Sequence, residues 1–581
     1  MKLNEVIKNL TDPVVSGDRS VEVSFITADS RQVKEGALFV AVSGSVDGHT
    51  FIDDAIKNGA VAIVAESAPN ETQQGKVSWV HTKRTKLALA DIANAFNGYA
   101  SDRLKVIGVT GTNGKTTTTY LIHHIMKDVW RRAGLIGTIR FDNGLSDVEA
   151  THTTPGAVKT HELLGEMVNN DCRGMAMEVS SHGIEQQRVR GVNFDVGVFT
   201  NLTQDHLDYH GSMEAYFKAK LALFEQMADL KEAGSDKRSV AVINTDDSYG
   251  QRMVKELGEK LSIWTYGMNA HSDFKFSKIR QTFKGTNFQL DVRGKSYLVQ
   301  VPLIGKFNVY NVVSAITACA AAGMKVRDAV KALSESPQVP GRMENVGNVN
   351  GMCVFVDYAH TPDALKNACL TMRELEPRNL ITVFGCGGDR DTQKRALMGE
   401  AAAENSEFCI VTSDNPRSED PESIIKMIEA GMKGKKYHAV VDRAEAIQAA
   451  IDFARPGDLV LIAGKGHETY QEFTTETLDF DDRLVAKRVL KDVRVGDLKE
   501  RMAKIKEQEQ NAKKFTRRDD DRTERRDDKP SERGEKSDFK GKGGDKFKRK
   551  EGEQTRGRVN NKFTGRVDKS KEKDKDEKDR S

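Results

Sequence analysis

Short runs of apolar residues recur through the first 495 residues, separated by stretches in which apolar positions follow helical spacing. Runs of about four to eight such residues, bounded by turn signals, predict strands buried on both faces of a parallel sheet. Two series of them predict two separate sheets within an α/β protein. The first series is 104–110, 174–179, 194–200 and 239–245, and the second is 352–357, 380–385, 408–413 and 458–464.

The two series imply separate domains, and a smaller α/β unit precedes them. That unit has strand candidates at 37–42 and 61–66 with a helix near 51–58. The segment SPQVPGR (336–342) interrupts any helix with two prolines and a glycine, and we expect a hinge there. The predicted domains are 1–95, 96–336 and 337–495, followed by a tail at 496–581.

The tail differs sharply in composition from the rest of the chain. Residues 500–581 hold 29 Lys plus Arg and 21 Asp plus Glu, a net charge of +8, so the overall +3 leaves −5 for the remainder. Few large apolar residues remain there to offset chain entropy, and disorder is expected, with a helical start near 496–514. Weak contact with RNA or an acidic partner is the interaction such a basic tail would support.

No run of about 18 apolar residues and no leader-like start is visible, which predicts a cytoplasmic protein without membrane insertion. The six cysteines are scattered and form no CxxC pair, so we expect reduced, buried thiols. A monomer is expected.

GVTGTNGKTT (108–117) follows a predicted strand and opens a predicted helix. Backbone amides at such a helix start can surround phosphate oxygens, Lys115 supplies positive charge, and the Thr116 hydroxyl can ligate Mg²⁺. Val109 stands where the common phosphate-loop pattern has glycine. ATP binding follows from this pattern, but the use made of ATP does not.

The glycine spacing of TGTNGKT resembles the Mur ligase family, and the resemblance extends over about residues 20–495. Each further motif is weak alone, but together and in this order they are specific. They are TNLTQDHLDYHG (200–211), GKFNVYN (305–311), GRME (341–344), DYAHTPDAL (357–365) and GKGHE (464–468). The resemblance implies a uridine-binding domain, a central ATPase domain with a parallel sheet and a Rossmann-like C-terminal domain. It also implies an ATP-dependent amide ligase acting through an acyl phosphate.

Such a reaction needs metal ions and cations rather than a nucleophilic side chain, because negative charge develops during phosphoryl transfer. Glu178 and His206 each follow a predicted strand and can reach one sheet edge. The resemblance makes them Mg²⁺ ligands beside Thr116, and matches Lys220 in AKLALF (219–224) to a lysine that is carbamylated in the family. Lys115 is the phosphate-binding cation. The expected nucleotide contacts are Gly111, Thr112, Asn113, Gly114, Lys115, Thr116, Thr117, Asn308, Arg342, Asp357 and His360.

Within the family, the members that attach the third peptide residue are the most similar. ADSRQVKEGALFVAVSGSVDGHTF (28–51), THTTPG (151–156) and EVSSHGIEQQRV (178–189) match their substrate-binding segments. The implied substrate is a UDP-linked muramoyl dipeptide. Its implied contacts are Ser30, Thr153, Thr154, Ser180, Gln186 and Arg188.

The incoming amino acid depends on SDNPRSEDP (413–421). The resemblance associates DNPR with meso-diaminopimelate, whose second carboxylate a guanidinium can hold with paired donors. The implied contacts are Arg390, Asp414, Asn415, Pro416, Arg417, Gly464 and Glu468.

Three alternatives remain at this stage. One is a lysine-adding ligase of the same family, which DNPR disfavours. Another is a folylpolyglutamate synthetase, which the N-terminal unit disfavours. The third is a phosphate-loop ATPase with an RNA-binding tail, in which Phe515, Phe539, Phe547 and Phe563 would stack on bases.

Overall fold

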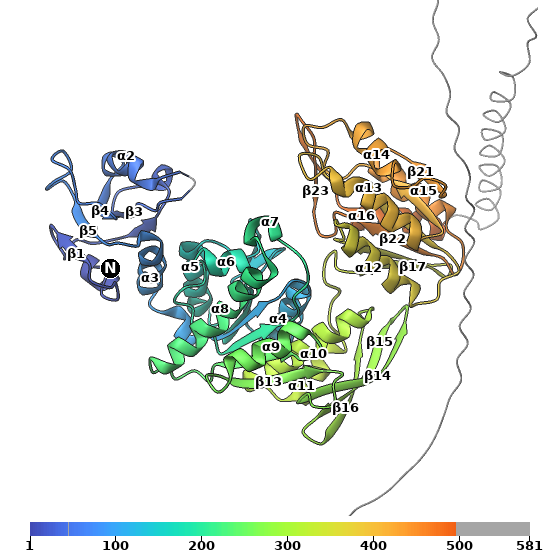
Figure 1. The fold of residues 1–581 in the computed structure, drawn as a ribbon, viewed down its shortest axis with the longest axis horizontal. Helices are drawn as coiled ribbons and strands as arrows, with labels where there is room; N and C mark the ends of the chain where they lie inside the picture. The colour runs from blue at the N-terminus through green and yellow to red at the C-terminus, as the bar shows by residue number, and fades with distance from the viewer. Residues whose placement is uncertain (45, 496–581) are drawn as a thin grey trace, which may run out of the picture. The chain divides into compact units, whose positions relative to one another are not determined.

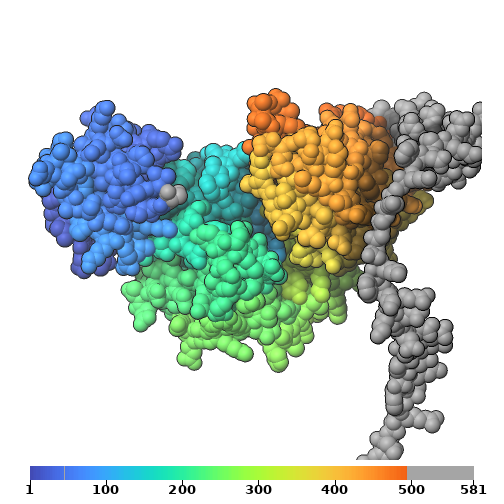
Figure 2. All heavy atoms as spheres, turned by 45° about the horizontal axis from the view of Figure 1, so that its top comes forward, coloured from blue at the N-terminus to red at the C-terminus, as the bar shows by residue number. Residues whose placement is uncertain are grey.

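The computed structural model describes residues 1–44 and 46–495, which form three β-sheets and one two-stranded ribbon (Figure 1). Each of the three sheets falls within one of the predicted domains, although the boundaries themselves stay a prediction. In the space-filling view, the blue, green and orange parts are each a closely packed body (Figure 2). The predictions of disorder, a helical start and RNA contact for 496–581 lie outside the described residues.

The first sheet has five strands in the order β1-β5-β4-β3-β2, parallel except for β1. Both predicted strands and the predicted helix of this unit are confirmed. The strands are β1 (Val14–Ser16), β2 (Phe25–Thr27), β3 (Ala37–Val40), β4 (Ala60–Ala65) and β5 (Ser78–His81). The helices are α1 (Leu3–Val6), α2 (Ile52–Lys57) and α3 (Thr85–Phe96), with short 3₁₀ helices η1 (Ser30–Gln32), η2 (Gly48–Phe51) and η3 (Ala100–Arg103).

The central sheet has eleven strands in the order β16-β15-β14-β13-β12-β11-β6-β10-β7-β8-β9. All four strands of the first predicted series lie side by side in its parallel centre. The strands are β6 (Lys105–Thr110), β7 (Ala133–Ile136), β8 (Arg140–Asp142), β9 (Asp147–Glu149), β10 (Gly174–Glu178), β11 (Val196–Phe199), β12 (Val240–Asn244), β13 (Ser262–Gly267), β14 (Phe274–Thr282), β15 (Gly285–Val292) and β16 (Lys295–Val301).

The central sheet is parallel in its middle, as predicted, and antiparallel strands extend it at both edges. β14, β15 and β16 form an antiparallel meander, and β7, β8 and β9 form another. In β14 and β15 buried and less buried positions alternate, as in strands with one covered face. Short turns join these strands, and only antiparallel neighbours can be joined in that way.

Helices cover both faces of the central sheet. One core cluster contains buried residues of α4, α10 and α11, and the other contains residues of α5, α8 and α9. The central strands are thus shielded from water on both sides, as their continuous apolar runs require. The helices are α4 (Lys115–Trp130), α5 (Ala157–Asn169), α6 (Ser181–Glu185), α7 (Leu207–His210), α8 (Met213–Glu232), α9 (Ser248–Leu257), α10 (Lys306–Ala321) and α11 (Val326–Leu333).

The third sheet has the order β17-β18-β22-β19-β20-β21 and is parallel except at β17. The second predicted series is confirmed as its four central strands. The strands are β17 (Glu344–Val349), β18 (Met352–Asp357), β19 (Leu380–Phe384), β20 (Phe408–Val411), β21 (Tyr437–Ala439) and β22 (Leu459–Ala463), with β23 (Tyr470–Glu472) and β24 (Thr477–Asp479) as the ribbon. The helices are α12 (Pro362–Arg373), α13 (Gln393–Asn405), α14 (Pro421–Glu429), α15 (Arg443–Phe453) and α16 (Asp482–Val495).

Strand register brings three chain segments to one edge of the central sheet. Glu178 at the end of β10 lies opposite Val109 of β6, and Phe199 at the end of β11 lies opposite Thr110. The loops that leave these strands therefore meet at the carboxyl edge, which is where open α/β sheets bind ligands.

The six cysteines are free and buried, as predicted. Within the described ranges, none of the helices is long and apolar enough to cross a membrane.

Candidate functional site

The phosphate loop connects β6 to α4 and depends on two glycines with positive φ. Gly111 has φ 147° and Gly114 has φ 86°. A Cβ on Gly111 would lie 1.9 Å from Thr200 Oγ1, and one on Gly114 would lie 2.3 Å from Asn311 Oδ1. Side chains at these two positions would therefore push the loop away from its neighbours, so glycine is required.

Lys115 begins α4 and folds its side chain back over the loop. Its Nζ donates to the carbonyl oxygens of Gly111 at 3.1 Å and Thr112 at 2.9 Å. Burial lowers the pKa of the Lys115 ammonium, while Glu178 works in the opposite direction. A cation held only by neutral carbonyls beside a helix N-terminus can exchange them for phosphate oxygens.

The rest of the loop is fixed by the segment that follows β11. Asn113 N donates to Asn201 Oδ1 at 2.9 Å, and Thr200 Oγ1 donates to the Asn113 carbonyl at 2.6 Å. Thr112 and Thr117 are buried. The predicted loop residues are thus brought together around a shape that is set before any ligand binds.

Glu178 ends β10 and is completely buried. Its carboxylate accepts hydrogen bonds from Thr116 Oγ1 at 2.9 Å, Thr138 N at 2.7 Å and Thr138 Oγ1 at 3.1 Å. A carboxylate beside a threonine hydroxyl provides the hard oxygen ligands that Mg²⁺ prefers. Thr116 and Glu178 therefore fit the predicted metal, and both belong to the edge that the register brings together.

Lys220 lies on α8, and its side chain contacts the same phosphate loop. Its side chain is only 1% exposed, and its Nζ donates to the Gly111 carbonyl at 2.9 Å and lies over the Tyr216 ring. Burial, with Lys115 nearby, holds the pKa of Lys220 well below its ordinary value. Burial of this kind favours the uncharged form of a lysine amine over the ammonium.

His206 is not brought to this carboxylate. It has φ 51° and precedes α7, its side chain is about half exposed, and its ring packs edge-on to His182 at 4.9 Å between centroids. Within residues 1–44 and 46–495, no group of three or more His, Cys, Asp or Glu could hold a metal ion. The predicted set of Thr116, Glu178, His206 and Lys220 is therefore assembled only in part.

Two of the predicted nucleotide contacts, Asn308 and Arg342, lie next to residues of the phosphate loop or their neighbours, and the other two lie at or just after the end of β18. Asn308 lies at the start of α10 and accepts from Asn311, the residue that packs on Gly114. Arg342 lies near the phosphate loop, where its Nη2 donates to Thr116 Oγ1 at 3.4 Å.

Asp357 ends β18 and His360 lies in the loop that follows it. The Asp357 carboxylate accepts from Met343 N at 2.7 Å and Ala359 N at 3.0 Å, and burial raises its pKa. His360 packs against Tyr358, whose ring also lies under the Arg342 guanidinium.

Four of the predicted muropeptide contacts form one hydrogen-bonded cluster. Thr154 Oγ1 contacts Ser180 Oγ at 3.1 Å, and Arg188 Nη1 donates to the Thr154 carbonyl at 2.7 Å. Arg188 also donates through Nε and Nη2 to Gln186 Oε1. Thr153 links this cluster to the surroundings of Glu178 through its hydroxyl, which lies 3.1 Å from Thr138 Oγ1.

Ser30 belongs to the first sheet's domain and opens η1. Asp29 caps this short helix by accepting from Arg31 N at 3.0 Å, and the Ser30 carbonyl accepts from Asn58 at 3.4 Å. No hydrogen bond in the described ranges links Ser30 to the muropeptide cluster.

Most of the predicted amino-acid contacts are assembled between the loop after β20 and the turn after β22. Asp414, Asn415 and Pro416 are buried, and a Cβ on Gly464 would lie 2.6 Å from Asp414 Oδ2. Asn415 Nδ2 donates to Glu468 Oε2 at 2.9 Å.

Arg417 already has partners. Its Nε donates to Glu472 Oε2 at 2.9 Å and its Nη1 to the Gly388 carbonyl at 2.9 Å. Two of its nitrogens are therefore engaged within the domain, and its role as a contact for the second carboxylate stays a prediction. Arg390 is exposed, and neither a hydrogen bond nor an ion pair is recorded for it in the described part of the chain.

Four residues that touch these groups were not predicted. Thr138 holds Glu178, Asn311 packs on Gly114, Lys465 contacts Asn415 and Glu468, and Glu472 holds Arg417. Asn311 and Lys465 lie inside the motifs GKFNVYN and GKGHE, so the motifs could have indicated them. Thr138 and Glu472 lie outside every motif, and the sequence carries no signal for them.

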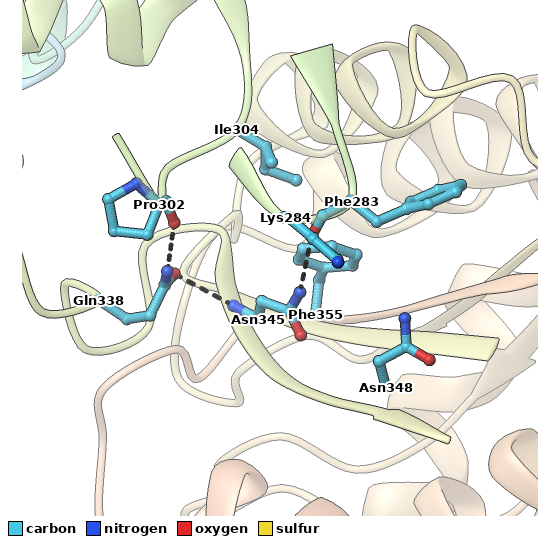
Figure 3. A pocket seen from close by; sticks show the side chains of 8 residues that line it. All are labelled: Phe283, Lys284, Pro302, Ile304, Gln338, Asn345, Asn348 and Phe355. Atoms are coloured by element: carbon cyan, nitrogen blue, oxygen red, sulfur yellow. Dashed lines mark hydrogen bonds between the residues drawn. The ribbon is translucent and has the colours of Figure 1, made fainter. Parts of the chain in front are cut away.

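A cavity of about 450 Å³ lies beside the predicted hinge, away from all these groups (Figure 3). Gln338 donates to the Pro302 carbonyl, and Asn345 Nδ2 donates to the Phe283 carbonyl at 3.2 Å. Gln338 and Asn345 are thus engaged in hydrogen bonds at the hinge, and the cavity contains none of the predicted site residues.

Three family models match successive parts of this chain. They are the Mur ligase family catalytic domain at residues 22–97, the Mur ligase middle domain at 109–319 and the Mur ligase glutamate ligase domain at 341–466. A relative from Syntrophomonas wolfei, named UDP-N-acetylmuramoyl-L-alanyl-D-glutamate--2,6-diaminopimelate ligase, is 44% identical over 495 residues, covering 84% of this chain and 99% of the relative.

The chain belongs to the Mur ligase family.

Solved structures of Mur ligases agree with the fold. One UDP-N-acetylmuramoyl-L-alanyl-D-glutamate--2,6-diaminopimelate ligase has TM-score 0.63 and 32% identity, covering 86% of this chain and 100% of that one. The Thermotoga maritima MurF ligase in complex with ADP has TM-score 0.52 and 20% identity, covering 82% and 97%, and supports the fold alone. The phosphate loop, Glu178 and Lys220 all lie within the part that matches the Mur ligase middle domain.

Proposed function

We propose that the chain is an ATP-dependent ligase that adds meso-diaminopimelate to UDP-N-acetylmuramoyl-L-alanyl-D-glutamate in peptidoglycan precursor synthesis. The observation that carries this proposal is a phosphate loop with an adjacent Thr116–Glu178 pair, in a chain that spans 99% of a relative bearing that name. The six free cysteines and the use of ATP fit a cytoplasmic enzyme.

Activation of the substrate carboxylate takes place at the phosphate loop. The γ-phosphoryl group passes from ATP to the carboxylate oxygen and gives an acyl phosphate with ADP as leaving group. Lys115 and the first amides of α4 hold the phosphates in line, and Arg342 lies close enough to share this task. Mg²⁺, held by Thr116 and Glu178, would neutralise phosphate charge.

Lys220 supports this site as a carbamate in the proposal. Its buried amine, whose pKa is held low by burial, adds to CO₂: an N–C bond forms, one proton is released, and the product is an anionic oxygen ligand. His206 stays a proposed ligand, but its loop must bring the ring nearer to Glu178 than it lies here.

Binding of the muramoyl peptide is assigned to the cluster around Thr154 and to Ser30. Arg188 is held rigidly by the Thr154 carbonyl and Gln186, so its guanidinium is pre-oriented for an anionic group of the substrate. Thr153 and Ser180 offer hydroxyls on the same face. Ser30 would contact the uridine end.

The amino acid is placed in the pocket of Asp414, Asn415 and Glu468. Arg417 and Arg390 receive the second carboxylate, which lysine lacks. The free amine of the bound amino acid attacks the acyl phosphate, and the tetrahedral intermediate expels phosphate to leave an amide. Closure of the domains about 336–342 would exclude water, which otherwise hydrolyses the acyl phosphate.

Product mass tests the proposal directly. The full chain is incubated with ATP, Mg²⁺ and the UDP-muramoyl dipeptide, with diaminopimelate or lysine, and Lys115→Ala serves as the inactive control. We expect a product heavier by one diaminopimelate residue, with one phosphate released for each amide. A preference for lysine would establish the lysine-adding alternative, and no product with either amino acid would refute the ligase assignment.

A further inference from the structure

Lys465 carries a charge into the interior of the C-terminal domain. It lies in the turn between β22 and β23, and its side chain is 0% exposed. A buried ammonium is costly unless its three donors find acceptors, so the chain tolerates it only with dedicated partners. The identity of those partners indicates the role of the Lys465 ammonium.

Both side-chain partners of Lys465 are residues of the proposed amino-acid pocket. Its Nζ donates to Asn415 Oδ1 at 2.9 Å and to Glu468 Oε2 at 3.0 Å. Asn415 Nδ2 donates to the same Glu468 oxygen at 2.9 Å, which closes a three-membered network. The Lys465 nitrogen therefore couples two groups that come from different loops, 53 residues apart in sequence.

This network determines which way the Asn415 amide faces. Its oxygen accepts from the Lys465 ammonium and also from Glu472 N at 3.0 Å. Because both of those groups only donate, the oxygen must face them, and the amide nitrogen must face Glu468. Without the ammonium, one strong reason for this orientation disappears.

The network engages only one of the two oxygens of the Glu468 carboxylate. Oε2 receives two donors, whereas no hydrogen bond is recorded for Oε1 among the residues the structure describes. Glu468 is 17% exposed at its side chain, so this second oxygen remains open to a ligand. The pocket thus presents one oriented carboxylate oxygen to the ammonium group of an amino acid.

We infer that Lys465 is a positioning residue for the incoming amino acid, which fixes the Asn415 amide and leaves Glu468 Oε1 directed at the substrate's ammonium group. This inference rests on the proposed function. Lys465 itself does not touch the substrate, because its side chain is 0% exposed and its ammonium faces Asn415, Glu468 and the ring of Tyr470.

Steady-state kinetics of Lys465→Gln test this role. The Michaelis constant for diaminopimelate is expected to rise about 10- to 100-fold, the range for losing a hydrogen bond to a charged group, while those for ATP and the UDP-muramoyl dipeptide stay within about twofold. Lys426→Gln, at an exposed lysine of α14 in the same domain, is the matched control and should change none of the three.

A double-mutant cycle separates positioning from damage to the fold. Because Lys465 acts through Glu468, its substitution should add little to the effect of Glu468→Gln on the same constant. Fully additive losses, or equal rises for all three substrates, would overturn the inference. So would an unchanged constant for diaminopimelate.

Thermal unfolding accompanies the kinetics. If Lys465→Gln does not fold, the Lys465→Met/Glu468→Gln double variant removes both charges of the buried pair and is expected to recover the melting temperature while the raised Michaelis constant remains. Recovery of the wild-type constant would overturn the inference. Failure of the proposed function itself would be visible separately, since the wild-type chain would then form no product.

Discussion

The phosphate loop and the proposed amino-acid pocket differ in whether their positively charged side chains form ion pairs. At the loop, Lys115 donates only to backbone carbonyls, and Arg342 donates to a hydroxyl. Within residues 1–44 and 46–495, no ion-pair partner is recorded for either of these two cations. In the C-terminal domain three cations at or beside the proposed pocket are paired: Arg417 with Glu472, Lys465 with Glu468 and Arg443 with Asp482.

This difference corresponds to the ligands that each region would receive. Unpaired cations suit a polyanionic nucleotide, which itself supplies the missing negative charge. A charge-balanced pocket suits an amino acid, which brings both signs and needs oriented groups rather than net charge. Substitutions at the loop should therefore reduce activity with little loss of stability, whereas substitutions in the pocket should affect stability or selectivity.

The largest effect is expected for Lys115→Ala. Removing a cation aimed at developing phosphate charge should lower the rate of phosphate release by about 100- to 1000-fold. The melting temperature should stay within about 2 °C, because the amine has only carbonyl partners. Lys218→Ala, an exposed lysine on α8, is the control, and a similar loss there would contradict the assignment.

Asp482→Asn tests how much a paired, buried cation of the C-terminal domain contributes to stability. Arg443 and Asp482 are both 0% exposed and paired through two hydrogen bonds of 2.7 Å. Leaving this arginine unpaired should cost about 3–5 kcal/mol of unfolding free energy, measured by denaturant titration. The exposed Asp479→Asn should change it by less than about 0.5 kcal/mol. Equal stability of the two variants would remove the basis of the comparison.

Lys220→Ala should reduce ligation by about 100-fold, since it removes one anionic ligand in its carbamate form. Added formate or acetate should restore part of the activity by supplying a carboxylate to the same space. Neither anion should affect wild-type enzyme or Lys218→Ala. Near-normal turnover of Lys220→Ala without any anion would refute the carbamate role.

The smallest effect is expected for Arg417→Ala. The Michaelis constant for diaminopimelate should rise about tenfold, because Arg390 still offers one guanidinium to the second carboxylate. The constant for ATP should not change. Arg488→Ala, on the exposed face of α16, controls for loss of charge in this domain, and equal effects on all substrates would count against the pocket assignment.

The sequence predicted the parallel strands and the phosphate loop because both depend on local pattern. The run 174–179 places Glu178 at a strand end, and register then carries it to the loop. His206 illustrates the limit of this reasoning. It also follows a strand end, but six further residues after β11 and a positive φ direct it toward His182 instead.

Contacts between side chains of different loops could not be predicted from the sequence either. Arg417 was predicted as a carboxylate contact, and the sequence did not indicate that Glu472, 55 residues later, accepts a hydrogen bond from its Nε. Nothing in the spacing of these two residues indicates that β23 runs beside DNPR. Alternation in β14 and β15 was the one overlooked pattern, since it predicts the antiparallel edge of the central sheet.

The Thr138 hydroxyl links the proposed metal site at Glu178 to the proposed muropeptide cluster at Thr153. This hydroxyl donates to Glu178 Oε2, so at the contact with Thr153 it can only accept. A ligand that draws the Thr153 hydroxyl away, or a cation that replaces the hydrogen bond from Thr138 to Glu178, changes the same chain of bonds. Thermodynamic linkage then requires that a metal at the proposed site and a muropeptide at the proposed cluster change each other's affinity by the same factor.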